Sequence, residues 1–289
     1  MATHSTYYIP KPSHWPLVGS IGLTTTVVGA ASWLHADWYA PYIFFIGLFI
    51  IFFMMFGWFG QVIYESQHGL YDMRVDRSFR WAMVWFIFSE VFFFGAFFGA
   101  LFFTRMWAVP ILAGEYHPMT HLLLWPNFEL SWPVLHNPNN QMFVGAHEGM
   151  SAWGIAAINT IILLSSAVTV TWAHWALKLN KRLQLCLGLA CTIILGIIFL
   201  FFQAHEYYLA YTEMNLTLDA GIYGATFFML TGFHGLHVTI GTTMLIVILI
   251  RALKGHFTSE RHFAFEGVAW YWHFVDVVWL FLFIFVYWL

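Results

Sequence analysis

Long apolar stretches separated by short polar segments repeat along the whole chain. Seven of these stretches hold roughly 20 residues or more, which is enough for a helix to cross a bilayer. They cover about residues 16–35, 42–64, 80–105, 150–174, 183–208, 220–251 and 262–287. The pattern predicts an all-α membrane protein with seven transmembrane helices in a single domain over residues 1–289, two within residues 1–64 and five within residues 80–289.

The prolines support this division, because a proline inside a helix removes a backbone hydrogen bond. All nine fall before spans, between spans or in a first helical turn. Most of them lie in the longest connection, at about residues 106–149. We therefore expect an irregular loop there and no proline inside a helix.

Basic residues are distributed unevenly between the two sides that these spans define. Of the 11 Lys and Arg residues, only Arg105 falls on the side of the long loop, and the others, from Lys11 before the first span onwards, fall on the opposite side. By the positive-inside rule this asymmetry places the N-terminus inside and the C-terminus and the long loop outside.

The composition excludes an ordinary soluble domain, since 61% of the residues are hydrophobic, 21% aromatic and only 9% charged. The net charge of −3 gives no reason to expect a nucleic-acid partner. Cys186 and Cys191 form no C-x-x-C or zinc pattern, so we expect them to pack. The first residues carry no basic run before an apolar core, so we expect them to be retained.

Glycine pairs occur within two spans. Gly95 and Gly99 form a G-x-x-x-G pattern in the third span, and Gly232 and Gly235 lie close together in the sixth. Small residues let helix backbones approach closely in membranes. We therefore expect both pairs to mark helix–helix contacts.

Ionisable residues lie at similar depth in three of the spans. This predicted buried polar layer consists of Glu90, His234, His237, His273 and Asp276. Because isolated ionisable groups are costly in a membrane, they are expected to face protein and to share hydrogen bonds. Two roles remain open for the layer, cross-linking of a dry bundle and proton handling. Glu90, surrounded by phenylalanines, is expected to be neutral unless a histidine meets it.

A second polar group lies at the predicted inner ends of the spans, and it consists of Glu65, Arg80, Arg261, His262 and Glu266. Basic and polar residues at this level favour either lipid headgroup binding or a solvated rim. At the outer end of the fifth span, Gln203, His205 and Glu206 are expected to cap the interface.

Several site classes are excluded. No lysine lies inside a span, which excludes a retinal Schiff base, and there is no G-x-G-x-x-G, Walker or G-x-S-x-G motif. A di-haem membrane protein needs histidine pairs at two depths in the membrane, and His234, His237 and His273 supply at most one such layer. The sequence thus predicts no catalytic residue and no metal ligand.

Several segments, taken together, resemble subunit III of the haem–copper cytochrome c oxidases, most of all a bacterial version. They include the strings GIYGATFFMLTGFHGLHVTIG and HFAFEGVAWYWHFVDVVWLFLFIFVYWL. The resembling segments are residues 4–17, 79–103, 158–174, 203–211, 221–241 and 262–289.

This resemblance implies an accessory subunit without a redox centre, in a proton-pumping complex that oxidises cytochrome c and reduces oxygen to water. It places haem and copper in the partner subunits I and II. Such a subunit packs directly on subunit I, supports its proton uptake, holds phospholipid in a cleft between its first two helices and the other five, and has been proposed to guide oxygen. The implied location is a multi-pass position in a bacterial inner membrane.

The resemblance also implies residue roles. Glu90 matches the family's buried, carbodiimide-reactive glutamate. The residues that match its phospholipid-contacting region are Glu65, Arg80, Arg261, Glu266 and Trp270. The end of the second span departs from the family pattern except at Glu65, and Arg261 stands where a histidine is usual, so the headgroup contacts there stay open. The alternative is a stand-alone transporter or channel that uses Glu90 and the mid-membrane histidines.

Overall fold

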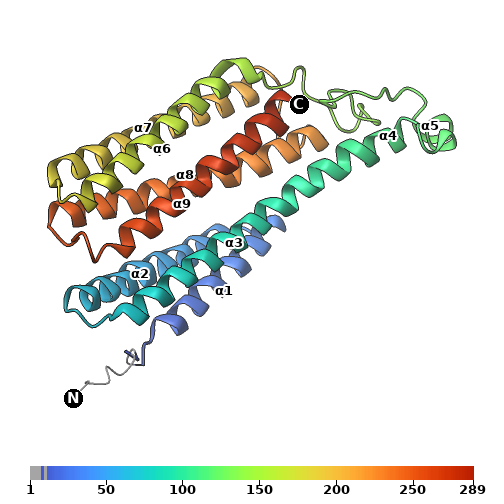
Figure 1. The fold of residues 1–289 in the computed structure, drawn as a ribbon. Coiled ribbons are helices and arrows are strands. Elements are labelled where there is room, and N and C mark those ends of the chain that lie inside the picture. Colours follow the sequence, from blue (N-terminus) through green and yellow to red (C-terminus); the bar gives the residue numbers. More distant parts are fainter. Residues whose placement is uncertain (1–7, 10–11) are drawn as a thin grey trace. The chain divides into compact units, whose positions relative to one another are not determined.

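The computed structural model describes residues 8–9 and 12–289, and within them every regular element is a helix (Figure 1). Seven helical segments are long and apolar enough to cross a membrane, as predicted. Lys11, which was predicted to lie on the inner side, is outside the described residues. The elements are α1 (Trp15–Leu34), α2 (Ala40–Gln67), α3 (Met73–Phe103), η1 (Thr104–Ala108), α4 (Val109–Leu112), α5 (Pro118–Leu124), η2 (Ala152–Ala156), α6 (Ala157–Lys178), α7 (Arg182–Thr212), α8 (Ile222–Leu253), α9 (Phe263–Leu282) and η3 (Phe283–Trp288).

The third span extends further at both ends than the apolar pattern indicated. It begins at Met73, where the Asp72 carboxylate accepts hydrogen bonds from the amides of Arg74 and Val75, as a helix-capping side chain does. It continues through the π-helical turn η1 into α4, which contains Pro110. The expectation that no proline lies inside a helix is therefore wrong at Pro110. The wider π turn leaves room for a ring that would clash with a regular helical turn.

Packing divides the chain into two compact units, and the first ends at Trp81. Helices α1 and α2 dominate it as an antiparallel pair (Figure 1). The two backbones approach most closely at glycines. A Cβ on Gly47 would lie 2.4 Å from the amide nitrogen of Thr26, and one on Gly29 would lie 2.4 Å from that of Phe44. No other residue type would permit this approach, so these glycines fix the α1–α2 crossing.

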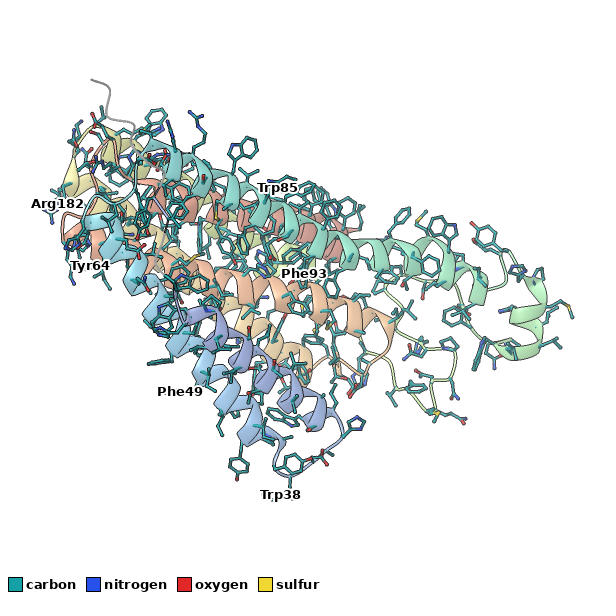
Figure 2. The ribbon with its side chains drawn as sticks, turned by 90° about the horizontal axis from the view of Figure 1, so that it is seen from below. Trp38, Phe49, Tyr64, Trp85, Phe93 and Arg182 are labelled. Carbon is teal, nitrogen blue, oxygen red and sulfur yellow. The ribbon has the colours of Figure 1, made fainter. Side chains whose placement is uncertain are left out.

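The second unit, Ala82–Leu289, contains the rest of α3 and the helices α6 to α9. In it α6 packs against α7, α7 against α8, and α9 against both α6 and α8. Half of the residues in the most apolar part of the last span, Phe263–Trp288, are buried, and this is the highest share of the seven spans. Figure 2 shows Trp85 pointing away from α3 on one side, while Phe93 points to the other side, where its ring packs against Phe233 of α8. The last helix is thus the centre of this unit.

The glycine pair of the third span does not make the expected contact within the described chain. A Cβ on Gly95 or Gly99 would meet nothing within 4 Å. In the sixth span, Gly235 does lie against α7, because a Cβ added to Gly235 would lie 3.1 Å from the side chain of Gln203. The large rings of α9 instead need small neighbours, because an added Cβ on Gly241 would lie 2.9 Å from the Trp272 ring.

Candidate functional site

Glu90 on α3 and His237 on α8 form the central pair of the predicted polar layer. The His237 Nε2 atom lies 3.0 Å from a Glu90 carboxyl oxygen, and His237 Nδ1 lies 2.6 Å from the carbonyl of Phe233. A carbonyl only accepts, so Nδ1 must carry a proton and donate it. One further proton then lies between Nε2 and the carboxyl group. The pair is neutral in sum whichever partner holds that proton, which lowers the cost of burial.

His234 is completely buried one turn before His237. Its Nε2 lies 3.1 Å from the backbone carbonyl of Val275 on α9, to which it donates a hydrogen bond. Its ring packs against Phe199 and Trp279, with centroids 5.6 and 5.2 Å away. His234 therefore links α8 to α9 as a neutral side chain within an aromatic core.

His273 and Asp276 pair along α9, as their spacing predicts. The His273 Nδ1 atom lies 3.5 Å from an Asp276 carboxyl oxygen, and His273 Nε2 lies 3.3 Å from the hydroxyl of Thr171 on α6. The Asp276 side chain is 6% exposed and that of His273 is 43% exposed. The imidazole thus covers the buried carboxyl group and joins it to α6.

The predicted layer is therefore three separate contacts in the described residues rather than one shared network. Glu90 with His237 joins α3 to α8, His234 joins α8 to α9, and His273 joins α9 to α6. The His234 contact ends on a backbone carbonyl and the His273 contact on a hydroxyl of a neighbouring helix, whereas Glu90 and His237 meet through their side chains. This arrangement can hold helices together, and it provides no continuous path of hydrogen bonds between the three contacts.

At the end of α2, in the first unit, Glu65 is held by its own neighbours. Its two carboxyl oxygens accept hydrogen bonds from Gln61 Nε2 at 2.9 Å and from the Tyr71 hydroxyl at 2.8 Å. Gln61 in turn accepts one from Trp15 Nε1 at 3.0 Å. Burial and the adjacent Glu65 carboxylate raise the pKa of the Tyr71 hydroxyl well above its usual value, so Tyr71 stays a donor. Arg80 forms an ion pair at 2.7 Å with Asp76.

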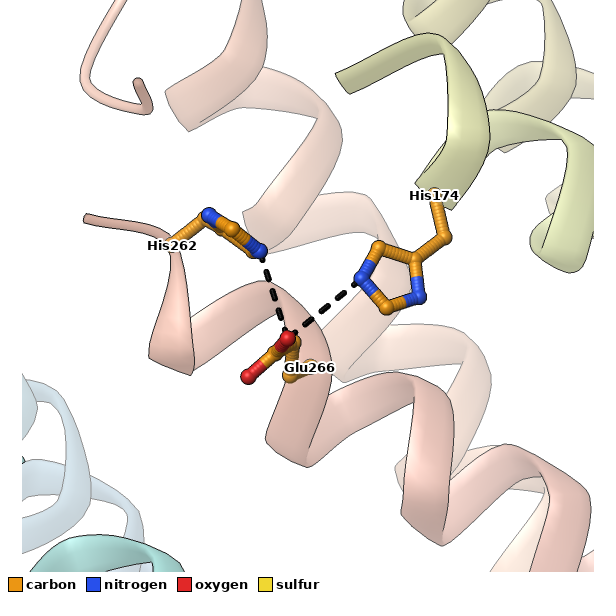
Figure 3. Close-up of side chains that lie close together, drawn as sticks. All are labelled: His174, His262 and Glu266. Atoms are coloured by element: carbon orange, nitrogen blue, oxygen red, sulfur yellow. Dashed lines mark ion pairs between the residues drawn. The ribbon is translucent and has the colours of Figure 1, made fainter. Parts of the chain in front are cut away.

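The corresponding end of the second unit contains Arg261, Glu266 and Trp270. Arg261 is exposed, and the half-buried Trp270 packs against the Phe263 ring at 6.5 Å. Glu266 is buried and faces two histidines (Figure 3). His262, one turn earlier, was grouped with it from the sequence, whereas His174 of α6 was not, because nothing in a sequence pattern aligns α6 with α9.

The polar residues at the far end of α7 are not interface caps, with the exception of the exposed His205. Gln203 is buried and donates a hydrogen bond to the carbonyl of Thr231 on α8 at 2.8 Å. Glu206 is 1% exposed and accepts one from the Tyr287 hydroxyl at 2.8 Å. The expectation of capping is wrong for both residues, because they face the bundle and cross-link it.

The fold and these contacts define a multi-pass integral membrane protein. In the part of the chain that the structure describes, its buried ionisable side chains pair mainly with other side chains and carbonyls of the same helix bundle. The sequence profile described as cytochrome c oxidase subunit III matches residues 4–138 and 123–289. The chain belongs to the cytochrome c oxidase subunit III family.

Curated relatives extend this match over the whole chain. A protein named cytochrome c oxidase subunit 3 from Drosophila melanogaster is 43% identical over 297 residues, which cover 100% of this chain and 99% of that protein. One of the same name from Oryctolagus cuniculus is 41% identical over 289 residues, 99% of this chain and 98% of that protein. Another, from Pongo abelii, is 42% identical over 283 residues, 98% of this chain and 96% of that protein.

Family membership makes the chain part of an oxidoreductase complex of aerobic respiration and implies that it holds no redox centre of its own. The predicted subunit function is confirmed, and the alternative of a stand-alone transporter loses its support. These three relatives come from animals and do not bear on the bacterial type, which stays a prediction.

Proposed function

We propose that this chain packs directly on subunit I of the oxidase, supports its proton uptake and leaves electron transfer to haem and copper in subunits I and II, with cytochrome c as the electron donor of the complex. One observation supports this most. The Glu90 carboxyl group meets His237 at 3.0 Å inside the bundle, so its proton is shared with a neighbouring helix of the same chain. A scaffold needs such internal pairs, whereas a transport path needs groups that connect to water.

We also propose phospholipid binding at the predicted inner ends, where Glu65, Arg80, Arg261, Glu266 and Trp270 lie. Glu65 already accepts two hydrogen bonds from its own unit, and Glu266 faces two histidines. Guanidinium recognises a headgroup phosphate well, so we assign this role to the exposed Arg261 and to Arg80 beside its ion pair with Asp76. Trp270 would lie beside the upper acyl chain, as aromatic residues at membrane interfaces do.

The charge asymmetry supports an orientation with the N-terminus and these arginines on the inner side of the membrane. We propose a bacterial inner membrane as the location, on the resemblance of the sequence to bacterial forms. A fusion of a reporter to each terminus tests the orientation, because a fluorescent protein at the N-terminus and alkaline phosphatase at the C-terminus would both be active. The reverse pattern would contradict it.

The subunit role is tested by purification through a tag on this chain. Subunits I and II should co-purify with a haem absorption spectrum, and the separated chain should show no haem absorbance. Recovery of a lone chain that transports a solute in liposomes would contradict the proposal.

The lipid role is tested with Arg80→Gln and Arg261→Gln, and Arg77→Gln serves as the matched control because Arg77 is exposed on the same helix as Arg80. Native mass spectrometry of the purified complex should show fewer retained phospholipids in the first two variants and the wild-type number in the control. Equal retention in all three variants would refute the assignment.

A further inference from the structure

Three side chains of the second unit, His174, His262 and Glu266, converge where α6 ends and α9 begins. The Nε2 atoms of His174 and His262 lie 3.5 and 3.2 Å from one carboxyl oxygen of Glu266 (Figure 3). One donor atom from each residue lies within 4.8 Å of the other two. Figure 3 shows both imidazole rings directed at the carboxyl group, one from each of two neighbouring directions. The residues come from two helices and from a connecting loop, so the convergence is a tertiary feature.

The hydrogen bonding of His262 directs a lone pair toward Glu266. His262 Nδ1 lies 3.0 Å from the backbone carbonyl of Thr258, and a carbonyl only accepts, so Nδ1 donates. In a neutral imidazole the Nε2 atom is then an acceptor, and it faces a carboxyl oxygen, which is also an acceptor. Two acceptors at 3.2 Å repel each other unless a proton or a metal cation lies between them, and the second imidazole beside the same oxygen favours the metal. A histidine that donates Nδ1–H to a carbonyl is also the usual state of a metal-bound histidine.

The distances agree with those between ligands of one tetrahedral ion. Zinc binds histidine nitrogen and carboxylate oxygen at about 2.0–2.2 Å, so two ligands on a tetrahedron lie about 3.3 Å apart. The two distances to the Glu266 oxygen, 3.5 and 3.2 Å, bracket that value. The widest donor separation, at most 4.8 Å, would have to shorten by about 1.5 Å, which rotation of the His174 side chain, 20% exposed, can supply.

We propose that His174, His262 and Glu266 bind a divalent transition-metal ion of the zinc class, which fastens the end of α6 to the start of α9. Two imidazoles and a carboxylate form a donor set that suits zinc rather than magnesium or calcium, which prefer oxygen ligands. A fourth position would be filled by water. Lys178 lies one turn after His174 and Arg261 precedes His262, and their positive charge weakens the affinity of the site for a cation.

Zinc binding by the purified oxidase complex tests this proposal. The complex is first treated with a chelator, equilibrated with micromolar Zn²⁺, and freed of unbound metal, and zinc is then measured per haem by elemental analysis. His174→Gln, His262→Gln and Glu266→Gln should each lose one zinc ion per complex. His256→Gln and Glu260→Gln change the same residue types in the neighbouring loop and should keep the wild-type content.

A measurement on the wild-type complex keeps the test decisive if a variant fails to assemble. Diethylpyrocarbonate modifies accessible histidine nitrogens, and mass spectrometry locates the products. His262 is buried and is not expected to react, whereas the His174 side chain is 20% exposed. Zn²⁺ should lower the modification of His174 several-fold and leave that of His256 unchanged. Unchanged modification of His174, or wild-type zinc content in assembled variants at all three positions, would overturn the proposal.

Discussion

The α1–α2 crossing offers a sharp test of the packing, because two glycines of α2 differ in what surrounds them. An added Cβ on Gly47 would lie 2.4 Å from the Thr26 amide nitrogen and 2.8 Å from its Cα, whereas one on Gly60 would meet nothing within 4 Å. Backbone cannot rotate away as a side chain can. For Gly47→Ala the helices must therefore separate by about 1 Å to reach an ordinary contact distance.

This separation sets the expected cost. Overpacking of this kind costs about 1–3 kcal/mol, and a clash with backbone belongs at the upper end. Helix pairs in lipid are held mainly by close packing, so the lost contacts are not replaced by a hydrophobic effect. Gly60→Ala has no clash and instead gains about 0.5–1 kcal/mol from the better helix propensity of alanine. The two variants should thus differ by about 2–4 kcal/mol in the local stability of α1 and α2.

Hydrogen exchange of the purified complex, followed by mass spectrometry of peptides, measures this local stability. A loss of about 2 kcal/mol corresponds to roughly 30-fold faster exchange where exchange follows local opening. Peptides of α1 and α2 should show this increase in Gly47→Ala and none in Gly60→Ala, and peptides of α7 serve as the internal reference. Equal exchange in the two variants would refute the reasoning that backbone contact at Gly47 fixes the crossing.

Further predictions concern buried hydrogen bonds. Trp272 donates a hydrogen bond from Nε1 to the Ser166 hydroxyl at 2.9 Å. A double-mutant cycle of Trp272→Phe and Ser166→Ala, measured by SDS titration of the chain in micelles, should therefore show a coupling energy of about 0.5–1.5 kcal/mol. Strictly additive effects of the two substitutions would contradict this prediction. Tyr71→Phe removes one of the hydrogen-bond donors to the buried Glu65 carboxyl group and should destabilise the end of α2 by about 1–3 kcal/mol in hydrogen exchange. Tyr64 of α2 is exposed, so Tyr64→Phe should change little. Equal destabilisation by the two variants would show that loss of the Tyr71–Glu65 bond is not the cause.

Much of the architecture could be predicted because membrane crossing leaves a local signal. A run of apolar residues is sufficient to identify a span, so all seven were found from the sequence. Their ends were less predictable, since the third span passes through a π turn and Pro110 without leaving the helix. Helix identity is local information, whereas the exact end of a helix depends on capping contacts such as that of Asp72.

The partners of the candidate site residues were harder to predict. The spacing of His273 and Asp276 on one helix predicted their contact correctly, because both belong to the same element. The contact of Glu90 with His237 followed from equal depth in two spans. His174 could not be placed beside Glu266, because depth does not specify which helix is the neighbour.

Glycine patterns were equally limited as guides to packing. The G-x-x-x-G pair in the third span has open space around both positions in the described chain, while the closest crossing uses single glycines on α1 and α2. A small residue permits a close approach but does not require one. Which glycines are used depends on the partner helix, and this is tertiary information.

The buried ionisable groups are expected to hold this subunit together and not to conduct protons, and the variant Glu90→Gln separates these two roles. A glutamine can donate its amide to the neutral His237 Nε2, so it keeps the link between α3 and α8 while removing the titratable proton. Glu90→Leu is the comparison that removes the link itself and should weaken assembly.

The measurement is the number of protons pumped per electron by the oxidase reconstituted in vesicles, with assembly verified by co-purification of the subunits. Glu90→Gln should show wild-type assembly and a wild-type pumping ratio. Loss of pumping in a fully assembled Glu90→Gln complex would contradict the structural role of this carboxyl group.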